Sequence, residues 1–343
     1  MMERPMNTQT IRQAAILAAG RGTRLAPLTN DRPKSLLPIM GRPILARLME
    51  CFHQAGISRI IVVTGPDLPQ VQASISETLP SGTRVEWVVQ PNPTGTVEAL
   101  ERALPLLSGP FLLAAVDNLT SAEHVRSLIA RHESSPMHIA TLSLVRATPA
   151  EIHQSADVLL AGEEVVSIVE KPARPMGQHA AIMLYAFSPD IAEYLPRVQP
   201  AGRGEREIVS ALQLALAAGR RIGTVLAPWR LHLTRPVDLL HLNSWFLRQM
   251  GAVQVQSDLP LSVRLIAPVW IDPGVQVGDH AVIGPEVYLE TGARIGAQAR
   301  LHHAVVLAKG IAPPAATLHH AVLDGHRCFF ADISEERDST SKE

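Results

Sequence analysis

The sequence predicts an α/β fold, a doubly wound and mixed but mostly parallel sheet covered by helices, followed by a solenoid of short strands. Two observations lead to this prediction. In the first two thirds of the chain, short apolar segments alternate with longer amphipathic segments, which is the pattern of β-α-β units. Beyond about residue 265, a hydrophobic residue recurs at every sixth position instead.

The α/β part is expected to contain buried parallel strands separated by helices. The expected strands are Ala14–Ala18, Arg59–Thr64, Val85–Val89 and Phe111–Ala115, and further strands dominate Ile139–Phe187. The expected helices are Pro43–Ala55, Leu68–Thr78, Val97–Leu107, Ala122–His132, Glu207–Ala218 and Val237–Gly251. Because ligands bind at the carboxyl ends of such strands, the loops that begin at Gly20, Gln90 and Asp117 should converge on one crevice.

The hexad after residue 265 is too short for a helical hairpin and fits one short strand on each flat face of a triangular solenoid. Its hydrophobic positions are Ile271, Val277, Ile283, Leu289, Ile295, Leu301 and Leu307. This pattern resembles the hexapeptide-repeat family, whose domains are left-handed parallel β-helices. The resemblance implies somewhat more than two coils before the repeat degrades near Pro313.

We therefore predict an α/β domain at 11–251, a linker at 252–265 and a short β-helix at 266–325. The polar ends, 1–10 and 332–343, are expected to be disordered tails. Because faces of short solenoids commonly associate, we expect a homo-oligomer.

Composition narrows the functional classes. A net charge of −1 lacks the basic excess of a nucleic-acid-binding protein. No apolar run is long enough for a membrane span, and no signal peptide precedes the first expected strand. Two cysteines are too few for a disulfide framework and suit a reducing compartment. We expect a cytoplasmic enzyme with neither nucleic-acid nor membrane partners.

The segment Leu17–Pro38, LAAGRGTRLAPLTNDRPKSLLP, carries the strongest chemical signal. Its glycines follow a strand, so their backbone amides can approach phosphate oxygens. A dinucleotide-binding loop would have a third glycine near Leu25, and a Walker loop would need Gly-Lys-Ser/Thr; neither is present. Lys34 follows a proline that restricts the backbone, and it is one of only four lysines in an arginine-rich chain.

This segment resembles the signature of the sugar-1-phosphate nucleotidyltransferases, and further motifs of that family follow in the family's order. They are Gln90–Thr96 (QPNPTGT), Val116–Asn118 (VDN), Glu170–Pro175 (EKPARP), Gly204–Val209 (GEREIV) and a late set from Trp229 to Asn243. The resemblance covers about residues 12–250. It implies a Rossmann-like nucleotidyltransferase domain, an enzyme of nucleotide-sugar biosynthesis, and a nucleoside triphosphate and a sugar-1-phosphate as substrates.

The resemblance also implies residue roles. Arg24 and Lys34 would be catalytic, with Lys34 stabilising the α-phosphate. The nucleotide would be bound by Leu17, Ala18, Ala19, Gly20, Gly22, Thr23, Gln90, Gly95 and Thr96, with Gln90 reading the pyrimidine edge. Asp117 would bind the cofactor Mg²⁺. Asn118, Glu170 and Lys171 would bind the sugar phosphate.

The acceptor side departs from the family pattern. Val116 and Met183 replace glycines, Ala156–Asp157 replaces a Tyr-Gly pair, and Leu231 replaces a second metal ligand beside His232. A side chain in place of glycine occupies space that ligand hydroxyls would use. We therefore expect an altered acceptor pocket.

Alternatives remain open at this stage. UTP is favoured over dTTP because the doubled alanine at Ala18–Ala19 resembles uridylyl branches, and glucose-1-phosphate or N-acetylglucosamine-1-phosphate is the default acceptor. The same motifs allow a dTTP-using enzyme, an enzyme of another triphosphate, or a non-catalytic regulatory homologue. Four histidines, His302, His303, His319 and His320, also raise the possibility of acetyl transfer in the β-helix.

Overall fold

The computed structural model describes residues 10–200 and 204–331, and the predicted disordered tails lie almost wholly outside these residues. The chain divides into two units. Unit 1 contains the residues up to Arg21 together with Leu45–Arg230, and unit 2 contains Gly22–Ile44 and the residues from Leu231 onward. No helix of the described residues is long and apolar enough to cross a membrane.

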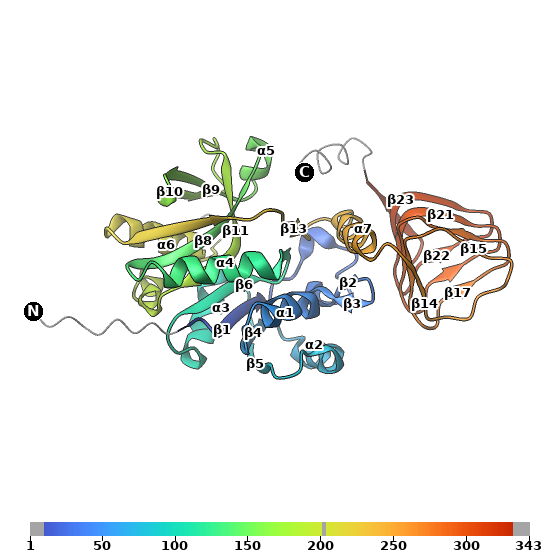
Figure 1. Cartoon of the computed structure of the whole chain (residues 1–343), viewed down its shortest axis with the longest axis horizontal. Coiled ribbons are helices and arrows are strands. Elements are labelled where there is room, and N and C mark those ends of the chain that lie inside the picture. The colour runs from blue at the N-terminus through green and yellow to red at the C-terminus, as the bar shows by residue number, and fades with distance from the viewer. Residues whose placement is uncertain (1–9, 201–203, 332–343) are drawn as a thin grey trace, which may run out of the picture. The chain divides into compact units, whose positions relative to one another are not determined.

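Unit 1 is built on a nine-stranded sheet with the order β5-β4-β1-β6-β11-β8-β12-β10-β9 (Figure 1). One half is the predicted parallel sheet, in which β5 (Arg84–Val89), β4 (Arg59–Thr64), β1 (Gln13–Ala18) and β6 (Phe111–Ala115) run in one direction. The other strands of this sheet are β8 (His138–Arg146), β9 (Ala156–Ala161), β10 (Glu164–Glu170), β11 (His179–Phe187) and β12 (Arg221–Leu226), whereas the short β7 (Asn118–Leu119) lies outside it. β11 is antiparallel to β6 and β8, so the sheet is mixed as predicted.

Helices cover both faces of this sheet. The helices of unit 1 are α1 (Ile44–Gln54), α2 (Leu68–Ile75), α3 (Thr96–Ala103), α4 (Ala122–Glu133), α5 (Pro149–Ile152) and α6 (Ile208–Ala217). The first residue of α1, Ile44, is grouped with unit 2. In β8, Leu142 belongs to the core shared with α3 and α6, whereas its neighbours Thr141 and Ser143 bond to histidines of α4. Because successive strand residues point to opposite faces, α4 lies across the sheet from α3 and α6.

Unit 2 contains helix α7 (Asp238–Met250), a hairpin of β2 (Pro38–Ile39) and β3 (Arg42–Pro43), and the short strand β13 (Leu231–His232). It also contains a stack of short strands, parallel except for the last one, that we call the strand stack. The strands of the stack are β14 (Val253–Val255), β15 (Arg264–Leu265), β16 (Val269–Ile271), β17 (Gln276–Val277), β18 (Val282–Ile283), β19 (Val287–Leu289), β20 (Arg294–Ile295), β21 (Arg300–Val306), β22 (Ile311–Ala312), β23 (Thr317–Asp324) and β24 (Arg327–Phe330).

Parallel pairing joins the strands in three sets: β14-β16-β19-β21-β23, β15-β18-β21-β23 and β17-β20-β22. The long strands β21 and β23 each belong to two sets, and the chain passes through the sets in turn. The partners of β14 and β16 are 16 residues apart. In the following pairs the spacing is 18, as between Ile271 and Leu289 or between Val277 and Ile295. Three hexads make one such repeat, so the strand pairing up to Leu301 is compatible with the predicted period. The interior is a core of small and branched side chains, with Ala281, Ala293 and Ala299 fully buried.

Two predictions about the repeat are wrong. Past Leu301 the spacing of partners falls to 17, so Leu289 pairs with Val306 rather than with Leu307, and Ile295 pairs with Ala312. The missing residue lies at a corner: three residues separate Ile283 from Val287, but two separate Leu301 from Ala304. The stack also continues past Pro313 through β23, because the hexad is shifted there and not lost.

The domain boundaries predicted at 251 and 265 stay predictions. Two observations bear on where such boundaries could be drawn. Strands β14 and β15 lie within the segment 252–265 that was expected to be a linker. The division into units also groups Gly22–Ile44 and α7 with the strand stack and not with the α/β sheet.

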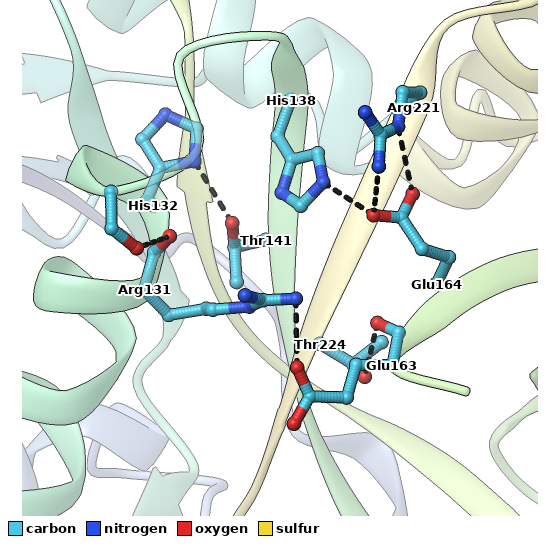
Figure 2. A network of polar contacts seen from close by, with 9 residues as sticks. Arg131, His132, His138, Thr141, Glu163, Glu164, Arg221 and Thr224 are labelled. Atoms are coloured by element: carbon cyan, nitrogen blue, oxygen red, sulfur yellow. Dashed lines mark hydrogen bonds and ion pairs between the residues drawn. The ribbon is translucent and has the colours of Figure 1, made fainter.

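A polar network joins α4 to the amino-terminal ends of β8 and β12 and to Glu164, which lies at the opposite end of β10 from the predicted site residue Glu170 (Figure 2). His138 and Arg221 both contact the carboxylate of Glu164, each at 2.8 Å. His132 shares a hydrogen bond of 3.0 Å with the hydroxyl of Thr141, and on the same helix His124 bonds to Ser143 at 2.8 Å. Burial lowers the pKa of both His124 and His132 to about 4, so both rings are neutral near pH 7.

These buried histidines predict acid lability. An unfolded histidine takes up a proton near pH 6.5 whereas the folded rings resist until about pH 4, so the free energy of unfolding should fall as the pH drops through this window. At about 1.4 kcal/mol per pKa unit, each ring can account for up to about 3 kcal/mol. Urea denaturation at pH 7.5, 6 and 5 measures the slope. It should flatten in the double variant His124→Gln, His132→Gln and stay unchanged in His326→Ala; equal slopes in all three proteins would contradict this assignment.

Candidate nucleotidyl-transfer site

The loops expected to bind the nucleotide follow strands that end at one edge of the sheet in unit 1. Leu17 of β1 lies opposite Ala115 of β6, and Thr64 of β4 lies opposite both Ala18 and Val89. Parallel strands in this register finish together. The structure therefore brings Gly20, Gln90 and Asp117 to the same edge of the sheet.

Gln90 is held in place by the loop that follows it. Its side chain is almost fully buried, and its amide nitrogen donates to the carbonyl of Gly95 at 3.2 Å and to the carboxylate of Glu98. Because these bonds fix the donor side of the amide, the position of its carbonyl oxygen is also fixed. A fixed acceptor of this kind suits recognition of a donor on a flat base.

Gly95 is irreplaceable for geometric reasons. Its φ is 120°, and a Cβ atom here would lie 2.4 Å from the carbonyl oxygen of Arg206. The close approach is a backbone ladder, in which the amide of Arg206 donates to Thr94 at 3.0 Å and the amide of Val97 donates to Arg206 at 2.9 Å. Arg206 is itself fixed by a bidentate ion pair with Glu101, at 2.8 and 2.9 Å.

Glu207 links this loop to the expected sugar side. Its carboxylate accepts a hydrogen bond of 2.8 Å from the hydroxyl of Thr96, which in turn accepts one from the amide of Ile208. Burial raises the pKa of Glu207, and the negative charge of Glu170 raises it further. The sequence motif GEREIV was recognised, but no role was assigned to Arg206 or Glu207. The bonds described above show that the motif orders the loop that is predicted to bind the base.

Glu170 ends strand β10, and it forms an ion pair of 3.0 Å with Lys171, the next residue. Lys171 has φ 44°, a left-handed conformation that costs a residue other than glycine free energy. Its amide donates to the carbonyl of Ser155 at 2.8 Å, which holds the conformation. Strained backbone of this kind concentrates at functional positions.

Asp117 and Asn118 follow β6 directly. Both are half-buried, and the amide of Asn118 donates to the carboxylate of Asp117 at 2.8 Å. Val116, which stands where the family has glycine, is almost fully buried, so its side chain packs inside the protein and does not reach into solvent.

Met183 lies in a bulge of β11. Between Ala181 and Tyr185 the register with β8 shifts by two residues, and Met183 immediately precedes Leu184, which lies opposite Ala114 of β6. Bulges aim side chains away from the regular alternation and are common beside active sites. Asp157, another departure, accepts bonds from the amides of Met176 and Gly177 and so fixes the loop after the EKPARP motif.

The remaining predicted residues lie in unit 2. Gly22 has φ 60°, and its carbonyl accepts a hydrogen bond of 3.0 Å from Thr29. A Cβ atom on Gly22 would meet the side chain of Lys34 at 3.2 Å, so the loop and the lysine are close neighbours. Thr23 and Arg24 are exposed in a short 3₁₀ turn, and Lys34 begins another after Pro33.

The segment around Lys34 is anchored within unit 2 by contacts that the sequence did not reveal. Arg32 pairs with the half-buried Glu290 of the strand stack at 2.7 Å. Asp31 also pairs with Lys309 at 2.6 Å, but both side chains are exposed, so this second pair anchors the segment little. Burial raises the pKa of Glu290, which the nearby Arg32 opposes. On the other side, the buried Asn243 of α7 accepts from the amide of Met40 at 2.7 Å and donates to the carbonyl of Pro38.

Leu231 and His232, the last departure from the family pattern, form β13. The ring of His232 lies 3.1 Å from the hydroxyl of Thr234. The sequence left open whether this histidine replaces the missing metal ligand. The structure places it in a hydrogen bond with its own loop.

An edge of parallel strands that presents a glycine loop, a buried glutamine and a carboxylate defines a nucleotide-binding α/β protein. The comparisons with known proteins agree. The model of the nucleotidyl transferase family matches residues 13–274. A glucose-1-phosphate thymidylyltransferase of Streptomyces griseus is 29% identical over 82% of this chain and 79% of its own length. A UTP–glucose-1-phosphate uridylyltransferase of Haloferax volcanii is 29% identical over 66% and 93%.

A solved structure of a UDP-glucose pyrophosphorylase with UDP-glucose has the same fold, with a TM-score of 0.62 at 20% identity over 70% of this chain and 99% of that one. The chain belongs to the sugar-1-phosphate nucleotidyltransferases of the nucleotidyl transferase family. It is an enzyme that transfers nucleotidyl groups.

Proposed function

We propose that this enzyme transfers a uridylyl group from UTP to a hexose-1-phosphate, such as glucose-1-phosphate or N-acetylglucosamine-1-phosphate, and releases pyrophosphate. The supporting observation is that Gly20, Gln90 and Asp117 follow strands that end at one edge of the sheet. In this arrangement one molecule can contact a phosphate loop, a base reader and a carboxylate.

The base is proposed to be a pyrimidine bound by Gln90, Gly95 and Thr96. Uracil and thymine present the same N3–H donor, from which the carbonyl oxygen of Gln90 can accept in either case. They differ by one methyl group. dTTP therefore fits this site about as well as UTP, and among the relatives both thymidylyl and uridylyl transferases occur.

In the proposed reaction an oxygen of the sugar phosphate attacks the α-phosphorus in line, forming a P–O bond while the bond to the β-phosphate bridging oxygen breaks. Gly22, Thr23 and Arg24 would hold the β- and γ-phosphates, with Leu17–Gly20 along the nucleotide. Lys34 would offset the charge that grows on the α-phosphate. Such transfers depend on positioning and charge neutralisation and little on covalent catalysis.

Asp117 fits the role of a Mg²⁺ ligand by its chemistry. It is a half-buried carboxylate at the carboxyl end of a strand, and Mg²⁺ takes one or two carboxylates with phosphate oxygens and water. When bound, the ion would supply charge neutralisation at the phosphates. Asn118 orients the carboxylate through its hydrogen bond of 2.8 Å.

For the acceptor, Glu170 would bind sugar hydroxyls, and Lys171 and Asn118 would bind the sugar phosphate. The left-handed backbone of Lys171 supports this role, since it holds the residue in one direction. Met183, in the bulge of β11, would make the acceptor pocket smaller and more apolar. We propose that the strand stack is a left-handed parallel β-helix used for packing and oligomer formation.

The experiment that tests this function incubates the protein and Mg²⁺ with UTP or dTTP and a panel of sugar-1-phosphates, and measures pyrophosphate. Release with a pyrimidine triphosphate that depends on one sugar-1-phosphate supports the proposal. Higher kcat/KM with dTTP would reassign the nucleotide. Release only with a purine triphosphate would refute the role of Gln90.

Replacing Asp117 should remove the metal dependence of the reaction. Asp117→Asn keeps the size and shape of the side chain but lowers its affinity for Mg²⁺, so we expect kcat to fall by roughly 10²-fold or more. The titration of activity against Mg²⁺ measures the effect. Asp190→Asn, which changes an exposed aspartate of the same unit, is the matched control. An unchanged Mg²⁺ curve in Asp117→Asn would contradict the assignment.

A further inference from the structure

The sequence Leu-His-His-Ala-Val occurs twice in the strand stack, at Leu301–Val305 and at Leu318–Val322. The two copies are 17 residues apart, which is the spacing of strand partners in this part of the stack. His302 therefore lies opposite His319, on the neighbouring parallel strands β21 and β23. The histidine pairs stack because both copies contain the same two-residue corner and lie side by side in the stack.

The four imidazole rings form a compact cluster. His302 stacks on His319 with ring centres 4.6 Å apart, and His303 stacks on His320 at 4.5 Å. The ring of His320 also meets that of His319 edge-on, at 4.1 Å and 87°. This perpendicular contact turns the ring of His320 toward the exposed pair His302 and His319, which stacking within each pair alone would not do.

The backbone explains why these rings converge. Successive side chains of a regular strand point to opposite faces. His303 and His320 have φ of 52° and 49°, so each copy turns a corner between its two histidines. The alternation is interrupted there. As a result, one ring nitrogen from each of His302, His319 and His320 lies within 4.8 Å of the other two.

We propose that His302, His319 and His320 bind one divalent transition-metal ion of the Zn²⁺ class. Imidazole nitrogen suits zinc, copper and nickel, whereas Mg²⁺ prefers oxygen ligands, so this site is chemically distinct from the one assigned to Asp117. Zn–N bonds of about 2.0–2.1 Å require the nitrogens to approach to about 3.4 Å. His302 and His319 are exposed and can make this small movement, and solvent supplies the fourth ligand.

The fourth histidine supports the site without joining it. The ring of His303 pairs with the carboxylate of Glu286 at 3.0 Å, and the same carboxylate contacts Arg248 at 2.7 Å. Since His303 stacks on His320, this chain of contacts fixes the plane of one ligand. His303 thus packs against a ligand without contacting the ion.

The ion joins two successive levels of the stack, since His302 lies on β21 and both His319 and His320 lie on β23. An ion that binds the folded chain but not the unfolded chain stabilises the folded state by mass action. Zinc should therefore raise the thermal midpoint of the full-length protein in a concentration-dependent way.

Isothermal titration with ZnCl₂ tests the proposal on the full chain after removal of metals by EDTA. We expect one zinc ion per chain, undiminished by excess Mg²⁺, and a visible ligand-field absorption when Co²⁺ replaces zinc. His302→Ala and His319→Ala change exposed side chains and should each weaken zinc binding at least tenfold. His326→Ala removes an exposed histidine of the adjacent turn and is the matched control.

Two results would overturn the proposal. The first is zinc binding by the wild type no tighter than by the double variant His302→Ala, His319→Ala. The second is an equal loss in His326→Ala. No nucleotide or sugar is present in this titration, so its outcome is independent of the nucleotidyl-transfer proposal.

Discussion

Lys34→Ala is expected to reduce kcat for nucleotidyl transfer by roughly 10²–10³-fold, the size of effect seen when one preorganised group that stabilises transition-state charge is removed. Charge grows on the α-phosphate as the P–O bond forms, and the ammonium of Lys34 is proposed to meet it. Single-turnover pyrophosphate release measures the change. Binding of UTP should weaken far less than kcat, because the contribution arises mainly in the transition state.

The matched control for Lys34→Ala is Lys309→Ala. Lys309 lies in the same unit, and its ion pair with Asp31 is exposed, so its loss should leave kcat within about twofold. Circular dichroism of both variants checks that the fold persists. If Lys34→Ala retains the wild-type rate, the phosphate role assigned to this lysine is wrong.

Gly95→Ala is expected to destabilise the protein by about 3–5 kcal/mol and to raise KM for the nucleotide. Two costs combine: alanine at φ 120° is strained, and its Cβ would lie 2.4 Å from a backbone oxygen of Arg206 that cannot move alone. Chemical denaturation measures the first effect and steady-state kinetics the second. The KM should rise because the same loop fixes Gln90 and Thr96.

Gly162→Ala separates these two costs. Gly162 also has a positive φ, 64°, but a Cβ atom there would meet nothing within 4 Å. Only the backbone strain remains, so a loss of about 1 kcal/mol with unchanged KM is expected. Equal losses in Gly95→Ala and Gly162→Ala would show that the contact with Arg206 does not constrain the loop.

Much of the fold could be predicted from local pattern. Arg59–Thr64 and Phe111–Ala115 form strands with the predicted bounds, because buried parallel strands are continuous apolar runs that turn signals delimit. The helices were predicted to within a few residues, with α3 giving way to a 3₁₀ turn after Ala103. The predicted hexad agrees with the spacing of strand partners up to Leu301, where the corners of the strand stack keep the same length.

What could not be predicted depends on contacts between distant residues. No local pattern shows that Arg206 would lie against Gly95, or that Arg32 would pair with Glu290. One deleted corner residue near His302 shifted the repeat, and a period counted along the chain cannot register such a deletion. The site residues themselves are predictions from motifs. The structure adds the bonds that hold Gln90, Thr96 and Asp117 in place.

The central claim is that a pyrimidine nucleoside triphosphate binds where β1, β5 and β6 end. A crystal structure of the protein with Mg²⁺ and UTP, without acceptor sugar, tests it most directly. The account predicts the uracil within hydrogen-bond distance of Gln90, the phosphates along Gly20–Arg24 and the metal ion on Asp117. A nucleotide bound elsewhere, or an edge filled by the protein's own side chains, would contradict it.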